Sequence, residues 1–351
     1  ESVKIYRGEG KTLVYIGDGV LVEGARPDVE AAYPDYPMNY KAGWGYMMLT
    51  NFLPDSGNGT FKIHAIATDK EGQSTGLGVK TITVDNANAI KPFGAIDTPG
   101  QGGTTSGSSF INWGWVLTPR PNSIPTNGST INVWIDGVNL GHPIYNIYRS
   151  DIANLFPGYA NSNGAVGYFY LDTTAYENGV HTIQWTATDN GGNTDGIGSR
   201  YFTIQNTGGG AARTAQSAER KMGAFNVDVS RIPADYPGLV ILKKGFNENK
   251  SPQEIYPDDE GIINIEIKEL ERVEIQLEGT MGLAPLSNYI GFLVIGDQLR
   301  SLPIGSTLDT KNGIFYWQPG PGFYGVYDFV FIKRDGIDRR KVRVIVKILP
   351  K

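Results

Sequence analysis

The sequence predicts an all-β protein made of tandem antiparallel sandwiches. Residues 26–86 and 149–206 are two copies of one module, with the same motifs in the same order. Both copies contain short segments in which apolar and polar residues alternate, as in a strand with one buried face. The 46 glycines and 19 tyrosines, with few long charge-patterned stretches, favour short strands joined by many turns. A duplication of this size indicates an array of domains rather than one large enzyme core.

The two copies match along their whole length, which gives residues 1–86 as repeat 1 and residues 87–206 as repeat 2. The matched motifs are Arg26-Pro-Asp28 with Arg149-Ser-Asp151, Tyr33-Pro34 with Phe156-Pro157, Gly45-Tyr46 with Gly167-Tyr168, Asn58-Gly59 with Asn178-Gly179, Gly76-Leu77-Gly78 with Gly196-Ile197-Gly198, and 81–86 with 201–206.

Alternating segments predict equivalent strands in the two repeats. In repeat 1 these segments are 3–6, 13–16, 61–66 and 81–84, and in repeat 2 they are 131–134, 138–140, 181–186 and 201–204. The third strand of each set follows Asn-Gly, which is the strongest short signal for a tight turn. A polar, glycine-containing stretch then leads to the last strand, so each repeat should contain a long hairpin.

Repeat 2 also contains an opening segment, residues 93–130, that repeat 1 lacks. Strand candidates surround 94–97 and 110–116, with a turn-rich stretch between them. Without these strands repeat 1 should have a bare sheet edge and an exposed apolar face. Three explanations stay open. The missing part was removed, residues 1–12 compensate for it, or another subunit supplies strands and so builds a polymer.

Each repeat carries one short helix candidate. Segments 28–33 and 151–156 begin at an aspartate, a good N-cap acceptor, and end before a proline. We expect the aromatic residue at the end of each segment to pack near the following Pro-x-Tyr. Arg26 and Arg149, two residues before these aspartates, are expected to form local charge pairs with them.

The last third of the chain predicts a linker and a third β-domain. Residues 207–256 mix Gly, Pro, Asn and Lys and are expected to be a linker with local order, including helical propensity at 211–222. Residues 257–351 contain alternating segments throughout and should form the C-terminal β-domain. Its expected strands are 262–267, 273–277, 290–295, 313–317, 326–332 and 342–348.

Several motifs resemble bacterial immunoglobulin-like repeats. They are the turn Ala187-Thr-Asp189-x-x-Gly192-Asn193 and the segments 133–138, 178–183 and 196–204. The segment 302–319 is similar to an immunoglobulin- and cadherin-like module of bacterial surface proteins, although Asn312 stands where that module usually has Thr. These resemblances imply immunoglobulin-like sandwiches and extracellular scaffolding or adhesion, without a defined ligand.

Composition excludes several classes of function. The chain has no cysteine, which rules out thiol catalysis and thiolate metal sites. Its net charge of −5 gives no basic footprint for nucleic acid, and no apolar run is long enough to span a membrane. The chain begins at Glu1, so either a signal or upstream region was removed or the sequence is a fragment. We expect an extracellular or cell-surface location.

One turn offers a candidate calcium site. Asp189, Asn193 and Asp195 place oxygen-bearing side chains at alternating positions before a glycine, as calcium loops do. The carboxylate that completes an EF-hand loop is missing, because Arg200 occupies that position. The alternative interpretation is a polar hairpin turn, and calcium is the one cofactor for which the sequence gives any indication.

Aromatic residues offer a second candidate site. Trp113, Trp115, Trp134 and Trp185 lie at alternating strand positions, which favours core packing. A surface on which sugars stack is the functional alternative, since aromatic residues are numerous around the strands of repeat 2. The tyrosines that would line it are Tyr145, Tyr148, Tyr159, Tyr168 and Tyr170.

Nothing in the sequence predicts an enzyme. The three histidines, His64, His142 and His181, lack partners at metal-binding or catalytic spacing. The acidic run 258–260 is typical of a solvated loop rather than of a catalytic carboxylate pair. The sequence therefore predicts an extracellular structural scaffold that self-assembles by strand complementation. The alternative is an adhesion module that binds polysaccharide or surface proteins.

Overall fold

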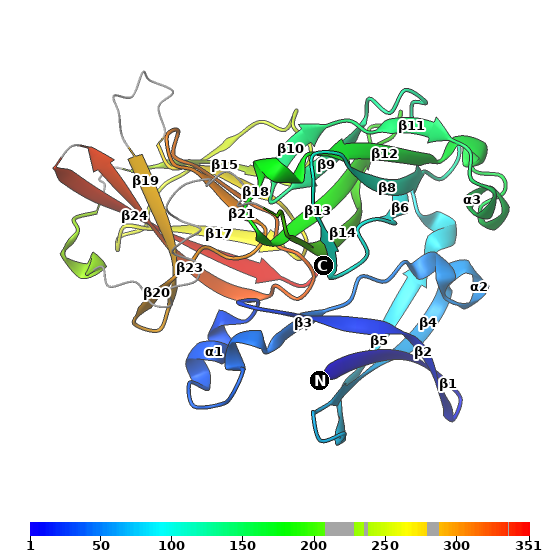
Figure 1. Cartoon of the computed structure of the whole chain (residues 1–351), viewed down its shortest axis with the longest axis horizontal. Helices are drawn as coiled ribbons and strands as arrows, with labels where there is room; N and C mark the ends of the chain where they lie inside the picture. Colours follow the sequence, from blue (N-terminus) through cyan, green and yellow to red (C-terminus); the bar gives the residue numbers. More distant parts are fainter. Residues whose placement is uncertain (208–227, 235–237, 279–287, 336) are drawn as a thin grey trace.

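The computed structural model describes residues 1–207, 228–234, 238–278, 288–335 and 337–351. Its strands form five sheets, which belong to three parts of the molecule (Figure 1). The all-β prediction is confirmed, and repeat 2 and the C-terminal domain are sandwiches in which every strand pair is antiparallel except β14–β7 and β17–β24. The helix expected at 211–222 lies outside the described residues.

Repeat 1 forms one open sheet instead of a sandwich. Its strands lie in the order β3-β2-β1-β4-β5, and every neighbouring pair is antiparallel. The bounds are β1 Ser2–Glu9, β2 Thr12–Val22, β3 Gly43–Gly45, β4 Asn58–Thr68 and β5 Ser74–Asp85.

Repeat 2 is a complete two-sheet sandwich. One sheet has the order β10-β9-β13-β14-β7 and the other β11-β12-β8-β6. The bounds are β6 Phe93–Ile96, β7 Gly103–Thr105, β8 Phe110–Leu117, β9 Ile131–Ile135, β10 Val138–Gly141, β11 Ile144–Ile147, β12 Val166–Leu171, β13 Gly179–Thr188 and β14 Thr194–Ile204.

The opening segment explains the difference between the repeats. It supplies β6, β7 and β8, so it provides half of one sheet of repeat 2 and an edge strand of the other. In repeat 2, β12 pairs with β8. In repeat 1 no counterpart of β8 exists, and β3, the counterpart of β12, pairs with β2 instead. Repeat 1 is therefore a single sheet that has no equivalents of β6, β7 and β8.

The C-terminal part is a second complete sandwich. Its sheets have the orders β16-β15-β18-β22-β21 and β17-β24-β23-β19-β20. The bounds are β15 Val240–Lys244, β16 Gln253–Ile255, β17 Ile262–Lys268, β18 Val273–Gln276, β19 Asn288–Ile295, β20 Gln298–Arg300, β21 Ser306–Asp309, β22 Ile314–Trp317, β23 Gly325–Asp335 and β24 Asp338–Leu349.

Part of the expected linker belongs to this sandwich. The prediction of a linker over 207–256 is wrong at its end, because β15 pairs with β18 and β16 pairs with β15. Val240 and Leu242 are buried in the C-terminal core. The strands were missed because β15 ends in two lysines and β16 is short and polar, so neither shows a long alternating pattern.

The two predicted helices are present, but each begins one residue early. They are α1 Pro27–Ala32 and α3 Ser150–Leu155, and α2 Pro54–Gly57 was not expected. Arg26 and Arg149 hold the N-cap positions without side-chain capping bonds, so the expected aspartate caps are wrong. Asp28 and Asp151 instead pair with these arginines, at 2.8 and 2.7 Å. Among the described residues, no helix has the length and apolarity to cross a membrane.

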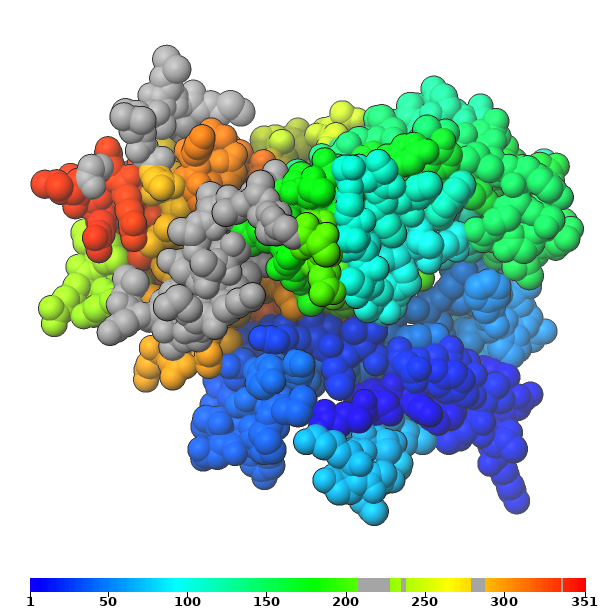
Figure 2. Space-filling view, viewed as in Figure 1, coloured from blue at the N-terminus to red at the C-terminus, as the bar shows by residue number. Residues whose placement is uncertain are grey.

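One buried hydrophobic cluster joins the three parts, although repeat 2 also has a separate core of its own. Val22 and Ala25 of repeat 1 and Tyr201 of repeat 2 belong to the same buried cluster as the core of the C-terminal sandwich. The Tyr327 hydroxyl donates to the Ala25 carbonyl at 2.6 Å, and the Tyr201 hydroxyl donates to the Pro321 carbonyl at 3.0 Å. Repeat 1 (blue) accordingly lies against both sandwiches in Figure 2. The three parts therefore pack together as one unit and are not separate domains joined only by linkers.

Repeat 2 buries the outer face of its five-stranded sheet against the C-terminal sandwich. The Arg272 guanidinium lies 4.7 Å from the Trp134 ring, and its Nε donates to the Gly137 carbonyl at 2.6 Å. Gln318 Nε2 donates to Gln184 Oε1 across the same interface. Because the inner face of this sheet packs in the sandwich core, both faces are excluded from water.

Candidate functional site

The open sheet of repeat 1 leaves apolar side chains in water that repeat 2 buries. Leu77 is 47% exposed, whereas its counterpart Ile197 is 4% exposed. Ile197 packs in the core beside Ile96, a residue of the opening segment. Repeat 1 has no counterpart of β6, the strand that carries Ile96, so no second sheet covers Leu77.

The rest of the inner face is partly covered by repeat 1 itself. The Tyr46 ring lies over Gly17, where a Cβ atom would come within 2.5 Å of the ring, and Trp44 lies over Gly19. The Tyr46 hydroxyl also donates to the Ile16 carbonyl at 2.8 Å. These contacts keep Val3 and Ile5 buried. Trp44 and Tyr46 do not extend over β5, so the inner face of that strand is not covered by them.

The outer face of repeat 1 is also open. Tyr15, Tyr6, His64 and Val79 are neighbours in register across β2, β1, β4 and β5, so their side chains share one face. Tyr15 is 51% and Val79 is 54% exposed. The counterparts of the last three in repeat 2, which are Trp134, Gln184 and Ser199, are buried at the interface with the C-terminal sandwich.

Strand β5 is a long unpaired edge. It is the last strand of its sheet, and nearly all of its 12 residues are exposed. The corresponding edge of β14 pairs with β7 in parallel, with Phe202 opposite Gly103 and Ile204 opposite Thr105. Lys80 and Asp85 are the only charged residues on β5, so few charges oppose pairing with another strand.

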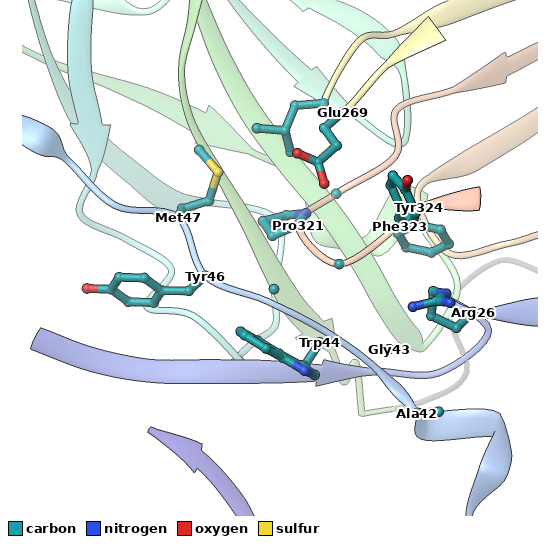
Figure 3. Close-up of a pocket in the computed structure, with 14 residues that line it drawn as sticks. Arg26, Ala42, Gly43, Trp44, Tyr46, Met47, Glu269, Pro321, Phe323 and Tyr324 are labelled. Carbon is teal, nitrogen blue, oxygen red and sulfur yellow. The ribbon is translucent and has the colours of Figure 1, made fainter. Parts of the chain in front are cut away.

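A cavity of about 310 Å³ lies between repeat 1 and the C-terminal sandwich. Arg26, Trp44 and Tyr46 line it from repeat 1, and Phe323 and Tyr324 from the C-terminal sandwich (Figure 3). The Arg26 guanidinium already has partners, since it binds Asp28 through two bonds and lies 5.8 Å from the Tyr324 ring.

Glycine at the wall of this cavity serves packing rather than a ligand. A Cβ atom on Gly45 would come within 2.3 Å of the Gly322 nitrogen and 2.4 Å of the Pro321 carbonyl carbon. The backbones of the two parts therefore touch here, which requires a residue without a side chain. The cavity is a gap that remains beside the close backbone contact between repeat 1 and the C-terminal sandwich.

The predicted calcium residues already have hydrogen-bond and ion-pair partners within the chain. Both oxygens of Asp189 are occupied: Oδ1 accepts from the amides of Gly191 and Asn193 at 2.9 and 3.0 Å, and Oδ2 accepts from Thr118 Oγ1 at 2.9 Å and Asn122 Nδ2 at 3.0 Å. Burial raises the pKa of Asp189, but these hydrogen bonds outweigh it and hold the pKa below its usual value. Asp189 thus ties the hairpin to the loop at 118–122.

The other two residues of that set have different surroundings. Asn193 donates its amide to Asp189 at 3.1 Å. Asp195 lies 3.7 Å from Lys91 Nζ and 3.6 Å from Lys351 Nζ, whose positive charges balance its carboxylate. These contacts favour the polar-turn interpretation. In the part of the chain that the structure describes, no three acidic, histidine or cysteine side chains gather as a metal site.

The five predicted tyrosines are not one surface. Tyr145 is buried, its hydroxyl donates to the Val116 carbonyl at 2.8 Å, and burial raises its pKa. Tyr159 packs with Phe93 at 5.2 Å under α3. Tyr148 is 65% exposed beyond the end of β11. Only Tyr168 and Tyr170 lie together, 5.3 Å apart on β12.

The remaining polar candidates have structural surroundings. Asp258, from the acidic run, accepts from the amides of Glu260 and Ile262 at 3.0 and 2.9 Å and so caps a turn. His181 is buried between Asp136 Oδ2 at 2.6 Å and the Glu177 carbonyl at 2.9 Å. These residues stabilise loops and strand ends, as expected.

Sequence reasoning did not single out Leu77, Val79 or the β5 edge. The alignment of Gly76-Leu77-Gly78 with Gly196-Ile197-Gly198 could have identified this position. It matches Leu77, which is exposed, with Ile197, which lies in a core. The sequence showed that repeat 1 lacks the opening strands, but it did not show that β5 is the strand left exposed.

Comparison with known proteins adds little. No protein-family model and no curated protein matches the chain. The endo-beta-1,4-mannanase from Thermotoga petrophila aligns at 15% identity and a TM-score of 0.24, over 35% of this chain and only 22% of the mannanase. The fibronectin(III)-like modules of Clostridium thermocellum CbhA align at 9% and 0.20, over 72% and 93%. The N-terminal four Ig domains of Dscam1 isoform 6.9 align at 8% and 0.21, over 99% and 70%. The fold assignment therefore rests on the strands and sheets themselves.

Proposed function

We propose that this chain is a non-enzymatic, extracellular structural scaffold that associates with other copies of itself through repeat 1. The observation that carries the proposal is the open β5 edge with Leu77 beside it, because the same positions of repeat 2 are paired and buried. An exposed, long and weakly charged edge strand favours association with another strand.

Rigidity supports the scaffold role. Val22 and Ala25 of repeat 1 and Tyr201 of repeat 2 are buried in the core cluster of the C-terminal sandwich, and buried hydrogen bonds from Tyr327 and Tyr201 join the parts. Such an interface holds the parts at fixed angles, whereas flexible linkers would let them rotate. A rigid body with one incomplete sheet can transmit a defined geometry to its neighbours in an assembly.

The association adds a strand of a neighbouring copy to β5. In repeat 2 the equivalent edge accepts β7 through backbone hydrogen bonds at 202–204, so repeat 1 offers the same acceptor positions at 82–84. Pairing of two β5 edges across a two-fold axis closes as a dimer. If each copy instead donates a different strand to the β5 edge of the next copy, the contacts do not close and a filament results.

Light scattering of the full chain over a range of concentrations, with negative-stain imaging of the same samples, tests the proposal. We expect the mass to rise with concentration and Leu77→Lys to shift the chain toward the monomer. Val326→Lys is the matched control, since Val326 is 48% exposed on the C-terminal sandwich. A chain that stays monomeric at high concentration, or equal behaviour of the two variants, would overturn it.

A further inference from the structure

Repeat 2 presents an aromatic group on the outer face of its four-stranded sheet. Tyr168 on β12 lies opposite Trp113 on β8 and opposite Ile144 on β11, so the three side chains share one face. Tyr170 follows two residues after Tyr168 and faces the same way. We call Trp113, Tyr168, Tyr170 and Ile144 the aromatic face.

This face points away from the sandwich core. Asn112 and Val116, which alternate with Trp113 along β8, are fully buried inside the sandwich. Asn112 Oδ1 accepts from the Trp185 indole at 2.6 Å in that core. Toward the other end of the same outer face, Trp115 is covered by Phe156 of the α3 region, with ring centroids 5.2 Å apart. Phe156 does not extend over Trp113, which is only half-buried.

The rings of the aromatic face are close together and accessible. The centroids of Trp113 and Tyr168 are 5.0 Å apart and those of Tyr168 and Tyr170 are 5.3 Å apart. Tyr170 is 56% exposed, Ile144 is 53% exposed, and Trp113 and Tyr168 are half-buried. The planes of Tyr168 and Tyr170 differ by 81°, so one flat ligand cannot lie on both rings.

Polar groups border the aromatic face. Among the described residues, the hydroxyls of Tyr168 and Tyr170 and the indole N–H of Trp113 have no hydrogen-bond partner, so they are free to bind a ligand. Asp97, which donates its amide to the Trp113 carbonyl at 2.9 Å, pairs with Arg149 at the edge of the face. Arg149 also pairs with Asp151 at 2.7 Å, so this partly exposed guanidinium is shared by two carboxylates.

From this arrangement we infer that the aromatic face binds a neutral glycan. A pyranose ring has one apolar face of C–H groups, which packs on the electron-rich face of an aromatic ring, and a rim of hydroxyls, which bonds to polar groups. The tilt between Tyr168 and Tyr170 suits a chain of rings that turns from one sugar to the next. The rings carry no charge, and at the edge of the face Arg149 is already paired with two carboxylates, Asp97 and Asp151, so no free cation is offered to an anionic sugar. This favours a neutral glycan over an anionic one.

The site is independent of the proposed assembly function. It lies on repeat 2, while the β5 edge lies on repeat 1. Failure of either proposal therefore leaves the other unaffected, and the two are separated by variants that change different strands.

Affinity electrophoresis of the full chain in gels containing soluble glucan, mannan, xylan or galactan tests the inference. We expect at least one of these neutral polysaccharides to retard the chain and to change its tryptophan fluorescence. Tyr170→Ala should weaken that binding by about tenfold or more, because it removes the most exposed ring. Tyr256→Ala is the matched control, since Tyr256 is 63% exposed on the C-terminal part.

Equal melting temperatures of the chain and both variants would establish that folding is intact, and Tyr168→Leu provides a second variant of the same face. No retardation by any of the four polysaccharides overturns the inference. It is also overturned if Tyr170→Ala binds like the unchanged chain. Loss of self-association in Tyr170→Ala, without any glycan binding, would assign the face to a protein partner instead.

Discussion

Leu77 and Ile197 hold the same place in two copies of one module, yet Leu77 is 47% exposed and Ile197 is 4% exposed. The difference does not come from their local sequence, since each lies between two glycines within the closing strand, β5 or β14. It comes from strands at the start of repeat 2 that repeat 1 does not have. Burial of this position is therefore set by a segment far away in the chain.

Truncation of this pair should give unequal losses of stability. Ile197→Ala should lower the free energy of unfolding by about 2–4 kcal/mol, because it opens a cavity in a packed core. Leu77→Ala should cost about 0.5 kcal/mol or less in the monomer, because water already surrounds the side chain. Urea unfolding at low protein concentration measures both values. Equal losses would mean that Leu77 is covered in solution.

Tyr327→Phe should weaken the attachment of repeat 1. The substitution removes the hydroxyl that donates to the Ala25 carbonyl at 2.6 Å and leaves that buried carbonyl without this donor. We expect a loss of about 1–3 kcal/mol. Hydrogen exchange should speed up first near residues 22–26. Tyr256→Phe, at an exposed position, is the control, and uniform acceleration over the whole chain would contradict a local role.

Asp189→Asn should destabilise repeat 2 by about 1–3 kcal/mol, because the amide nitrogen cannot accept the bonds that the carboxylate accepts now. The folded pKa of Asp189 lies below the unfolded value. Its contribution is therefore present above about pH 4 and is lost as the pH falls through the folded pKa. Thermal unfolding between pH 2 and 7 should show a smaller acid loss in the variant.

The same samples test calcium. If hydrogen bonds alone occupy Asp189, then calcium or a chelator should leave the melting temperature of the unchanged chain where it is. A calcium-dependent rise that disappears in Asp189→Asn would restore the metal interpretation of this turn.

Alkaline pH should destabilise the junction of the three parts. Burial raises the pKa of the Tyr201 and Tyr327 hydroxyls above the usual value. A group with a raised folded pKa stabilises the fold below its unfolded pKa, about 10 for tyrosine, and this contribution is lost as the pH rises through the folded pKa. Ultraviolet titration should show exposed tyrosines ionising first and the buried ones only with unfolding. Early ionisation of all 19 tyrosines would contradict the shared core.

Arg272→Lys should destabilise the interface between repeat 2 and the C-terminal sandwich although it keeps the charge. Arg272 lies over the rings of Trp134 and Tyr316 while its Nε donates to the Gly137 carbonyl. An ammonium group has neither the planar shape nor the second donor direction. We expect a loss of about 1–3 kcal/mol in chemical unfolding, against almost none for Lys244→Arg on the surface.

Local patterns predicted most of the fold. The alternation of the strands and the Asn-Gly turns placed the hairpins, because a strand with one buried face must alternate. The tryptophan spacing predicted burial, and Trp115, Trp134 and Trp185 are buried, whereas Trp113 is only half-buried on the outer face of its sheet. The internal repeat predicted the open sheet of repeat 1, since missing strands are visible in an alignment of two copies.

Contacts between the parts could not be predicted in the same way. Tyr201 and Ala25 look like ordinary strand and loop residues, and their partners lie over a hundred residues further along the chain. The surroundings of the candidate calcium residues could not be predicted for a related reason. The donors that occupy Asp189 include Thr118 and Asn122, which the hairpin sequence does not contain.

The buried cluster that joins the three parts also sets how the molecule would respond to mechanical force. In an array joined by flexible linkers, tension unfolds the domains one after another, and each event lengthens the chain. Here Val22, Ala25 and Tyr201 are embedded in the same core as the C-terminal sandwich, so a pull on one part loads all three. The chain should therefore behave as a short strut that yields in one rupture, rather than as an extensible spring.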